Sequence, residues 1–377
     1  MNRKQKFLLI SSHAPSLVNF RGPLLTALMA AGHSVSVAAP MLLPESPTAR
    51  TLKKMGIPSY DFSLSRTGMN PVADFVMAVS LFRLMRKIRP DFVLSYTIKP
   101  VIWGTLAAWI ARVPRRYALI TGLGYAFTGK ATGKRLIIQR IARWLYKCAL
   151  ARATKVFFQN PDDAALFKNL GLVPGHVPIV VVNGSGVDTA HFAPVPLPKG
   201  PMSFLLIARL LGDKGIREYV QAASIIRRSH PTVRFDLVGG LDTNPDTIAL
   251  AEVERWHALG DIIWHGPLDD VRPAIAAAHV YVLPSYREGT PRTVLEAMSM
   301  GRAVITTDAP GCRETVVEGI NGFLVPVRDE VALANAMKRF IDRQDLVVEM
   351  GLTSRRIAED KYDVHKVNAV MLAEMGL

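Results

Sequence analysis

Apolar and polar residues follow two patterns that alternate along this chain. Short runs rich in β-branched residues are typical of buried strands, and the segments between them have apolar positions at helical spacing. This repeated order predicts parallel sheets, because parallel strands need a crossover, usually a helix, between them. In the first half we predict strands at 6–12, 34–39, 91–95, 116–121, 155–159 and 179–182, and helices at 22–31, 72–89, 101–111, 133–151 and 161–170.

A loop rich in proline and glycine, 192–201, separates this half from a second one that repeats the pattern. There we predict strands at 203–208, 234–238, 262–265, 280–284 and 303–307, helices at 215–228, 246–258, 268–277, 291–300 and 330–342, and a last helix after 359. The fold class expected is α/β, with two Rossmann-like domains facing a cleft and ligands at the carboxyl ends of the strands. The expected domains are 1–190, 191–358 and a C-terminal helix, 359–377, that returns to the first domain.

Length and composition agree with two buried cores, because 377 residues exceed one ordinary domain and 49% of them are apolar. The only cysteines, Cys148 and Cys312, predict no disulfide framework and favour a reducing compartment. The most apolar stretches, 76–82 and 101–111, are shorter than the about 20 residues that span a bilayer, so we expect no transmembrane helix. The apolar run 7–10 is too short for a signal peptide and is interpreted as a first strand.

Positive charge is concentrated in the first half. Residues 1–190 contain 25 Lys and Arg against 7 Asp and Glu, whereas residues 191–377 contain 21 against 24. The whole chain has a net charge of +15. This asymmetry indicates that the first half faces a polyanion, such as a membrane, a nucleic acid or a charged substrate.

Two glutamates flank a predicted helix start in the second half. Thr290 followed by Pro291 favours a helix with Thr290 as its N-cap and Pro291 at its first position. Glu288 then lies in the preceding loop and Glu296 in the second turn. The N–H groups between them form an anion site, and the carboxylates can accept hydrogen bonds from sugar hydroxyls. The alternative is an ordinary strand–helix unit with two solvated glutamates.

A cationic pair, Arg209 and Lys214, follows the first strand of the second half. At the carboxyl end of a strand, two cations can neutralise a diphosphate leaving group. The alternative is a surface arginine and lysine in a turn. Because this pair and the two glutamates are expected at the same end of one sheet, each motif supports the functional interpretation of the other.

These motifs together resemble the family 4 retaining glycosyltransferases of GT-B fold. The resemblance rests on Arg209, Lys214-Gly215, and the glutamates Glu288 and Glu296 with seven residues between them. Supporting segments are 182–188, 236–240, 308–314 and 321–325. The resemblance covers essentially the whole chain and is strongest over residues 180–330. It implies transfer of a sugar from a nucleotide-sugar. The expected donor is UDP-N-acetylhexosamine or UDP-hexose, and GDP-mannose is the next candidate.

The resemblance also implies roles for individual residues. Glu288 is expected to contact the donor sugar, Glu296 to hold the ribose, and Arg209 with Lys214 to bind the diphosphate. Further donor contacts are expected from the backbone at Gly289, Thr290, Pro291, Arg292, Thr293 and Val294, from His265 and Gly266 along the nucleobase, and from Gly22 facing the phosphates. Enzymes of this fold typically need no metal, and the chain has no Asp-x-Asp motif and no histidines at ligand spacing, so no cofactor is expected.

The sequence departs from the family at one position. Many members have a histidine near the carboxyl end of the fourth strand, and the segment 119–125 has none. Thr121 or the backbone near Gly122 is expected to take over its contacts. His13, just after the first strand, is the other candidate, although an ordinary loop histidine is the favoured interpretation.

The first half is expected to bind the acceptor, as in other enzymes of this fold. Asn19, Arg21, Lys99 and Thr121 lie in segments that are similar to those of bacterial enzymes that extend polyprenyl-diphosphate-linked sugars. An anionic lipid carrier would account for Arg21 and Lys99. A structural role is slightly favoured for each of these two residues when it is considered alone.

A basic amphipathic helix predicts contact with an anionic membrane. Between residues 129 and 160 there are eight Lys or Arg and no acidic residue. Five apolar residues share one helical face there: Ile137, Ile138, Ile141, Trp144 and Leu145. We expect a peripheral protein on the inner face of the cytoplasmic membrane. The alternative is a helix packed on its own sheet with a solvated basic face.

Two other functions stay open at this point. A sugar-nucleotide epimerase would share the fold but usually needs more cleft carboxylates and histidines than are found here. A basic nucleic-acid-binding protein would explain the charge, but no recognition motif appears, so we expect no nucleic-acid partner. For the transferase we expect a front-side displacement, in which the leaving diphosphate takes the acceptor proton and Arg209 and Lys214 stabilise the developing charge.

Overall fold

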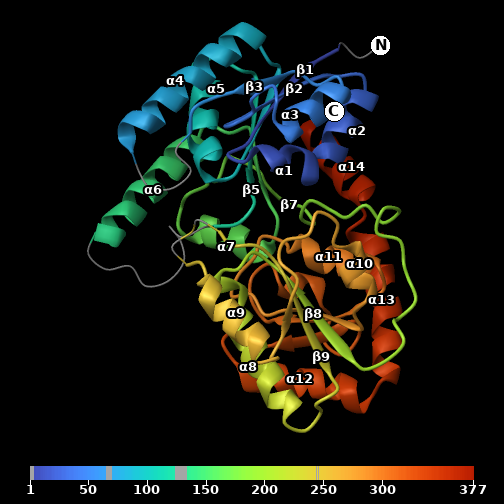
Figure 1. Cartoon of the computed structure of the whole chain (residues 1–377). Helices are drawn as coiled ribbons and strands as arrows, with labels where there is room; N and C mark the ends of the chain where they lie inside the picture. Colours follow the sequence, from blue (N-terminus) through green and yellow to red (C-terminus); the bar gives the residue numbers. More distant parts are fainter. Residues whose placement is uncertain (1–3, 65–69, 124–133, 243, 245) are drawn as a thin grey trace. The chain divides into compact units, whose positions relative to one another are not determined.

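The computed structural model describes residues 4–64, 70–123, 134–242, 244 and 246–377 (Figure 1). The chain divides into two compact units, Met1–Ser185 with Asn368–Leu377, and Gly186–Val367. Each unit contains one parallel sheet with buried apolar clusters on both of its faces. The expected α/β class with two Rossmann-like sheets is therefore confirmed.

The first unit contains a seven-stranded parallel sheet in the order β3-β2-β1-β4-β5-β6-β7. Its strands are β1 (Lys6–Ile10), β2 (Ser34–Ala39), β3 (Ser59–Asp61), β4 (Phe92–Tyr96), β5 (Arg115–Ile120), β6 (Lys155–Phe158) and β7 (Ile179–Val181). Successive side chains point to opposite faces, so that Phe7 and Leu9 join one buried cluster and Leu8 and Ile10 another. Burial on both faces explains why the central strands are continuous apolar runs.

Helices cover both faces of this sheet. The first face packs against α1 (Ala14–Asn19), α2 (Gly22–Ala30), α3 (Pro47–Lys54) and α14 (Val364–Met375). The second face packs against α4 (Pro71–Ile88), η1 (Pro100–Gly104), α5 (Thr105–Ile110), α6 (Lys134–Leu150) and α7 (Pro161–Asn169). The end of the chain, red in Figure 1, completes the first core, because Met371 and Met375 of α14 are buried in it.

The second unit contains a six-stranded parallel sheet in the order β10-β9-β8-β11-β12-β13. Its strands are β8 (Ser203–Ile207), β9 (Arg234–Val238), β10 (Ile263–Trp264), β11 (Val280–Leu283), β12 (Ala303–Thr307) and β13 (Gly322–Val325). Its helices are η2 (Gly212–Lys214), α8 (Ile216–Arg227), α9 (Leu250–Ala258), α10 (Arg272–Ala276), α11 (Arg292–Ser299), η3 (Arg313–Thr315), α12 (Glu330–Asp342) and α13 (Asp345–Lys361). Buried side chains of α8, α9 and α12 lie on one face, and those of α10 and α11 on the other.

The predicted linker, 192–201, packs against the second unit. The side chain of Arg302 is 1% exposed and donates hydrogen bonds to the carbonyl oxygens of Val195 and Pro196 at 3.0 and 3.1 Å. The same guanidinium donates to Ile275 at 3.0 Å. These contacts attach the loop to α10, and the boundary between the units falls earlier in the chain, between Ser185 and Gly186.

Several elements differ from the prediction. The pattern did not indicate the helices α1, α3 and α13 or the strands β3 and β13, and the last helix begins at Val364 and not directly after residue 359. The predicted helix 246–258 begins only at Leu250, and 268–277 is reduced to Arg272–Ala276. The predicted helix 101–111 is a π-helical turn followed by a short α-helix. Gly124 and the basic residue Lys130, which belonged to segments singled out above, lie outside the described residues.

Candidate functional site

The strand order of the second sheet identifies one point where a ligand site is expected. The chain leaves β8 towards β9 on one side, and β11 lies on the other side of β8. The loops that follow β8 and β11 therefore run in opposite directions. In open parallel sheets, ligands bind in the crevice between two such loops. Arg209 and Lys214 follow β8, and Glu288 follows β11. The two predicted motifs therefore meet at the carboxyl ends of adjacent strands.

Lys214 and Glu288 form an ion pair across this point. Lys214 Nζ donates to Glu288 Oε1 at 2.6 Å, and Ser285 Oγ donates to the same oxygen at 2.9 Å. Both charged side chains are largely buried. Burial lowers the pKa of Lys214, but Glu288 and Asp213 raise it more in sum, so that its pKa lies above the ordinary value. The ammonium is therefore charged, and it lies at the switch point of the sheet, the place where the loops after β8 and β11 diverge.

Arg209 has a different partner. Its Nη1 donates to Asp242 Oδ2 at 2.6 Å, and its side chain is 59% exposed. Its charge nevertheless acts on Lys214, whose pKa it lowers slightly. The structure thus places the two cations near each other but pairs them with different carboxylates, and Arg209 is the more accessible of the two.

The helix start between the two glutamates differs from the prediction by one position. α11 begins at Arg292, and Pro291, with ψ of 107°, is its N-cap in place of Thr290. The Val294 N–H already donates to the Pro291 carbonyl at 3.1 Å. The expectation that Thr290 is the cap was wrong because Pro291 itself keeps an extended conformation. Glu296 still falls in the second turn.

The loop around Glu288 is held by a neighbouring turn. The Glu288 N–H donates to the Pro310 carbonyl at 2.9 Å. Gly311 has φ of +81°, and a Cβ on it would lie 2.1 Å from the Glu288 carbonyl oxygen and 2.6 Å from that of Gly289. Glycine is therefore required at this position both by conformation and by space.

Glu296 is a buried carboxylate with one cationic partner. It is 7% exposed, and Arg292 Nε donates to its Oε1 at 2.8 Å. Burial raises the pKa of Glu296, although Arg292 opposes the rise. Burial raises the pKa of the nearby Tyr281 hydroxyl, and the charges of Glu296 and Glu288 add to the rise. This hydroxyl donates to the Ile207 carbonyl at 3.1 Å, next to the end of β8.

The segment expected along the nucleobase lies at the end of β10. His265 Nε2 lies 2.7 Å from Asp236 Oδ1, and Gly266 has φ of +69°. Trp264 Nε1 donates to the Gly239 carbonyl at 3.0 Å. The His265 side chain thus contacts Asp236 of β9. The backbone of His265 and Gly266 are the parts of this segment that can line a ligand.

The first unit has its own switch point, between β1 and β4. Arg21 is buried between α1 and α2, with its Cζ 5.4 Å from the centre of the Tyr96 ring. Tyr96 Oη and Ser16 Oγ are 2.7 Å apart. Asn19 is exposed at the end of α1. A Cβ on Gly22 would meet nothing within 4 Å, so the fold of this unit leaves open space there.

Within the part of the chain that the structure describes, Lys99 and Thr121 are not joined to Arg21 by a hydrogen bond or an ion pair. Lys99 Nζ donates to Asp74 Oδ1 at 2.8 Å, and both side chains are largely buried. This pair ties η1 to α4 and accounts for the charge of Lys99. Thr121 follows β5 and is half-buried. His13, the N-terminal flank of α1, accepts a hydrogen bond from Ser16 Oγ through its carbonyl at 2.6 Å.

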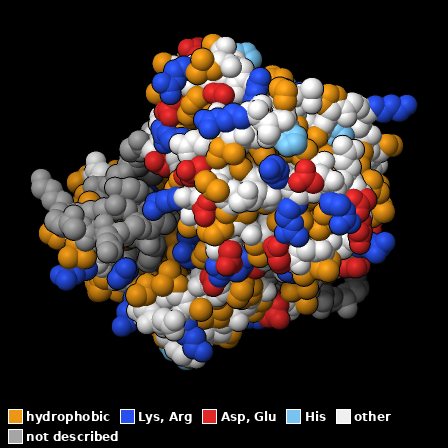
Figure 2. All heavy atoms as spheres, turned by 90° about the horizontal axis from the view of Figure 1, so that it is seen from below, with side chains coloured by type: hydrophobic (Ala, Val, Ile, Leu, Met, Phe, Trp, Pro, Cys, Tyr) orange, Lys and Arg blue, Asp and Glu red, His pale blue; other side chains and the backbone are white. Residues whose placement is uncertain are grey.

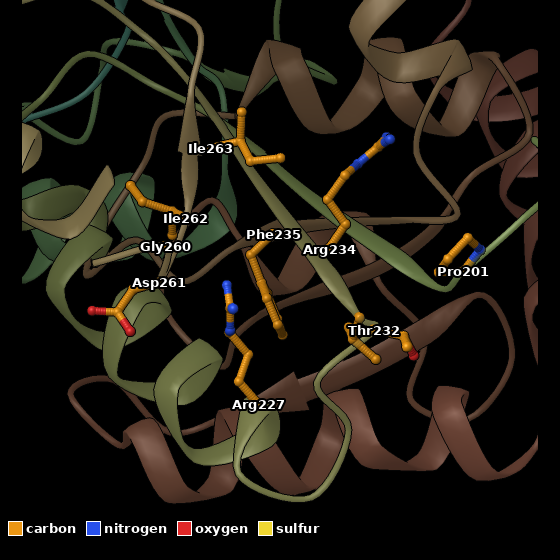
Figure 3. A pocket seen from close by; sticks show the side chains of 10 residues that line it. Pro201, Arg227, Thr232, Arg234, Phe235, Gly260, Asp261, Ile262 and Ile263 are labelled. Carbon is orange, nitrogen blue, oxygen red and sulfur yellow. The ribbon is translucent and has the colours of Figure 1, made fainter. Parts of the chain in front are cut away.

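A separate hollow of about 220 Å³ lies at the opposite end of the second sheet (Figure 3). Arg234 and Ile263, which line it, stand at the starts of β9 and β10. Because donor ligands bind at the carboxyl ends of parallel strands, this hollow is not assigned to the same site. No group of three or more His, Cys, Asp and Glu that could hold a metal occurs within the described ranges.

Sequence reasoning missed several residues that support the site. Ser285 donates a hydrogen bond to Glu288, and the charge of Asp213 helps to raise the pKa of Lys214 against the effect of burial. Asp242 forms the ion pair with Arg209. Gly311 fixes the backbone of the Glu288 loop. The signal that could have found Gly311 was its place in the segment 308–314, which carried part of the resemblance. Nothing in the sequence marks Asp242, because it is distant along the chain.

Comparison with known proteins agrees with the geometry. Residues 21–184 match the glycosyl transferase 4-like domain, and residues 201–343 match glycosyl transferases group 1. An N,N'-diacetylbacillosaminyl-diphospho-undecaprenol alpha-1,3-N-acetylgalactosaminyltransferase of Campylobacter jejuni is 27% identical over 369 residues, 93% of each chain. A UDP-Gal:alpha-D-GlcNAc-diphosphoundecaprenol alpha-1,3-galactosyltransferase of Escherichia coli is 26% identical over 285 residues, 72% of this chain and 71% of its own.

Solved structures show the same fold. Sucrose-phosphate synthase of Thermosynechococcus elongatus superposes with a TM-score of 0.79 at 21% identity over 98% of both chains. Anabaena HepE in complex with UDP-glucose superposes with a TM-score of 0.76 at 17% identity over 99% of both chains. The named relatives are transferases, which gives no support to the epimerase or nucleic-acid-binding alternatives. The chain, which matches a glycosyl transferase 4-like domain in its first half and glycosyl transferases group 1 in its second, is therefore a glycosyltransferase of GT-B fold.

Proposed function

We propose that this enzyme transfers a sugar from a UDP-linked donor, a UDP-N-acetylhexosamine or UDP-hexose, to a polyprenyl-diphosphate-linked saccharide during synthesis of a cell-surface polysaccharide or glycan. Both named relatives act on diphospho-undecaprenol-linked sugars, and the Escherichia coli enzyme is named for UDP-galactose. The Campylobacter jejuni enzyme is similar along 93% of both chains, so the similarity includes the unit where the acceptor is expected.

The Lys214–Glu288 ion pair at the switch point of the second sheet carries the proposal. It sets a buried cation and a carboxylate 2.6 Å apart at the carboxyl ends of β8 and β11, beside the start of α11. In the proposed complex, Lys214 and Arg209 bind the donor diphosphate, and Glu288 accepts a hydrogen bond from the sugar. Charge-assisted bonds of this kind are the strong ones in a partly desolvated site.

The rest of the donor is proposed to lie along α11 and β10. Glu296 would hold the ribose hydroxyls, because its carboxylate is fixed by Arg292 at 2.8 Å. Backbone N–H groups from Gly289 to Val294 would approach the phosphates, as the first turn of a helix favours anions. His265 and Gly266 would lie along the base, and Gly22 of the first unit would face the phosphates.

The proposed reaction keeps the configuration of the transferred sugar. The bond from the anomeric carbon to the leaving diphosphate oxygen breaks, and a bond to the acceptor oxygen forms on the same face. The acceptor hydroxyl proton passes to the leaving diphosphate. Lys214 and Arg209 stabilise the negative charge that develops on this group. Such stabilisation by preorganised charges is usually the largest single contribution to catalysis.

Donor screening with two variants tests the proposal. Purified protein is incubated with UDP-sugars, with and without a polyprenyl-diphosphate sugar, and released UDP is measured. We expect acceptor-dependent turnover that falls about 10²- to 10³-fold in Lys214→Met and Glu288→Gln, as for other lost electrostatic contacts to a transition state. The matched control is Arg217→Met, whose side chain pairs with Glu252 on the nearby α9 and should keep full turnover. Full turnover by Glu288→Gln would reject this site.

The acceptor is proposed to bind to the first unit. Asn19 and Arg21 frame the turn between α1 and α2, and Thr121 follows β5. Arg21 is the strongest of these candidates because its cation is buried and stacked on Tyr96. Lys99 stays a prediction, and its ion pair with Asp74 shows that any contact with the acceptor would have to compete with an existing partner.

Peripheral docking on an anionic membrane is also proposed, on the inner face of the cytoplasmic membrane. On α6, large apolar side chains are exposed, with Trp144 at 63% and Ile137 at 59%, although Leu145 is largely packed inward. The chain contains no acidic residue between Asp91 and Asp162. An apolar patch with a basic surround is the pattern of an interfacial helix. No helix in the described part of the chain is long and apolar enough to cross a membrane.

A further inference from the structure

A second hollow, of about 450 Å³, lies at the β3 edge of the first sheet. Tyr60 and Asp61 of β3 form one wall, and Ser80, Arg83 and Lys87 of α4 form another. Strands β2 and β1 separate β3 from the switch point, a distance of about 10 Å at ordinary strand spacing. The hollow is open to solvent and large enough for a small polar group. No donor or acceptor role proposed above uses this hollow.

The hollow has a positive charge that the protein leaves available. Arg83 and Lys87 are one helical turn apart and therefore share a face of α4. Neither has an ion-pair partner among the residues that the structure describes. Among the described residues that line the hollow, Asp61 is the one acidic residue, and its Oδ1 already accepts a hydrogen bond from the Leu42 N–H at 3.1 Å. From residue 62 to residue 73 the sequence contains no Asp or Glu. An anion is therefore the complementary ligand.

The same helix exposes apolar side chains next to the hollow. Val72, Phe75 and Val76 lie in the N-terminal half of α4, and Phe75 is 66% exposed. Val76 and Arg83 are seven residues apart, which is about 10 Å along an α-helix. The polar headgroup layer of each leaflet is about 5–8 Å thick. Lys87 lies about 6 Å further along the helix axis, so both cations reach the depth of the lipid phosphates when α4 is inclined towards the membrane plane with its apolar half against the acyl chains.

We propose that this hollow binds the phosphate-bearing headgroup of one anionic phospholipid. Arg83 and Lys87 neutralise the phosphate, and the Ser80 hydroxyl and the Tyr60 ring line the remaining space. The proposal rests on the peripheral docking proposed above and adds a discrete headgroup site to it. A bound lipid at this edge fixes how the first unit lies on the bilayer, which a diffuse basic surface does not.

The test compares two double variants that lose the same charge. Arg83→Ala/Lys87→Ala removes the cations of the hollow. Lys53→Ala/Lys54→Ala removes two exposed cations from α3, on the opposite face of the sheet. Binding is measured by sedimentation with phosphatidylcholine vesicles that contain phosphatidylglycerol. Because each cation near an anionic surface contributes about 1 kcal/mol, the first variant should bind about 10- to 30-fold more weakly, and the second less than about threefold.

The outcomes separate this proposal from the one it rests on. If wild-type protein does not bind anionic vesicles, membrane docking fails and the headgroup site fails with it. If wild type binds and the two double variants bind equally, only the headgroup site is rejected. Saturable binding of glycerol 3-phosphate without vesicles, lost in the Arg83→Ala/Lys87→Ala variant while vesicle binding stays normal, would identify a soluble phosphate ester as the ligand instead. Unchanged melting temperatures in both variants confirm that folding is intact.

Discussion

At the residue scale, the contact between Lys214 and Glu288 determines what the donor must displace. The ammonium already has a carboxylate partner at 2.6 Å, so a diphosphate gains affinity only by sharing or replacing that bond. An unpaired buried cation would be costly, and the pair keeps the site charged without a ligand. Arg209, which is exposed and bound to Asp242, is free to move towards an incoming phosphate with a smaller loss. The two cations of the predicted motif therefore differ: Lys214 is a fixed charge in the site, and Arg209 is the one that can move towards the ligand.

The buried pair of Arg292 and Glu296 gives a pH-dependent prediction. Burial raises the pKa of Glu296, so its contribution to stability is present at low pH and is lost as pH rises through the raised pKa. Arg292 opposes this rise. In Arg292→Met the pKa of Glu296 should rise further, and the ionised carboxylate loses its partner. We expect the variant to be about 1–3 kcal/mol less stable than wild type at pH 8 and nearly equal to it at pH 4. Melting temperatures measured across this range check the prediction.

A double variant provides the control for that experiment. In Arg292→Met/Glu296→Gln the titrating group is absent, so its melting temperature relative to Glu296→Gln should not change with pH. An equal deficit of Arg292→Met at pH 4 and pH 8 would show that the lost stability comes from packing of the arginine stem and not from charge.

At the element scale, the loop that carries Glu288 depends on Gly311. In Gly311→Ala the new Cβ would lie 2.1 Å from the Glu288 carbonyl oxygen, so the loop or the turn must move. A displacement of about 1 Å in a catalytic loop can lower turnover about 100-fold. The positive φ costs about 1–2 kcal/mol more. We expect both a lower melting temperature and a loss of turnover of at least about tenfold.

Gly319→Ala is the matched control for Gly311→Ala. Gly319 has φ of +73°, but a Cβ there meets nothing within 4 Å. This variant should lose a similar conformational free energy and keep its turnover. If turnover falls equally in both variants, the close approach of Gly311 to Glu288 has no functional consequence.

The elements that the sequence predicts well are those with a strong period and a buried face. Strands β2, β9 and β12 and helix α12 have the predicted bounds, because their apolar runs end at clear turn residues. Helix α13 was missed because Gly351 interrupts its pattern. This glycine is needed for packing, because a Cβ at Gly351 would lie 2.4 Å from the Gly301 carbonyl oxygen. The π-helical η1 has no periodic signature of its own. At the site, residue types and strand ends were predictable, whereas partners distant in sequence, such as Asp242, were not.

At the scale of the whole molecule, net charge is a poor guide to where a polyanion binds. The face seen in Figure 2 mixes acidic and basic side chains, although the chain has a net charge of +15. The excess positive charge comes from the first 190 residues, and much of it lies in the acid-free stretch between Asp91 and Asp162. Charges separated by more than about 8–10 Å are largely screened at physiological salt. Binding to an anionic surface is therefore expected to follow local clusters on the first unit.

The path of the chain makes the first unit depend on the last residues of the sequence. Met371 and Met375 of α14 are buried in the first core, the Met375 carbonyl accepts from Tyr117 Oη at 2.8 Å, and Lys155 Nζ pairs with Glu374 at 2.6 Å. Truncating a buried methionine to alanine costs about 2–5 kcal/mol. In Met371→Ala, hydrogen exchange measured by mass spectrometry should therefore become faster in β1, β2 and β4.

The second unit should respond differently, because its apolar clusters contain no residue of the α14 segment after Val367. Exchange in β8, β9 and β11 should keep its wild-type rate in Met371→Ala, provided that the two cores unfold separately. Val370→Ala is the control on the same helix, since Val370 is 49% exposed and should change neither unit by more than about 0.5 kcal/mol. Equal acceleration in both units of Met371→Ala would mean that the two sheets unfold as one cooperative body, and that the return of α14 couples them as well as completing the first core.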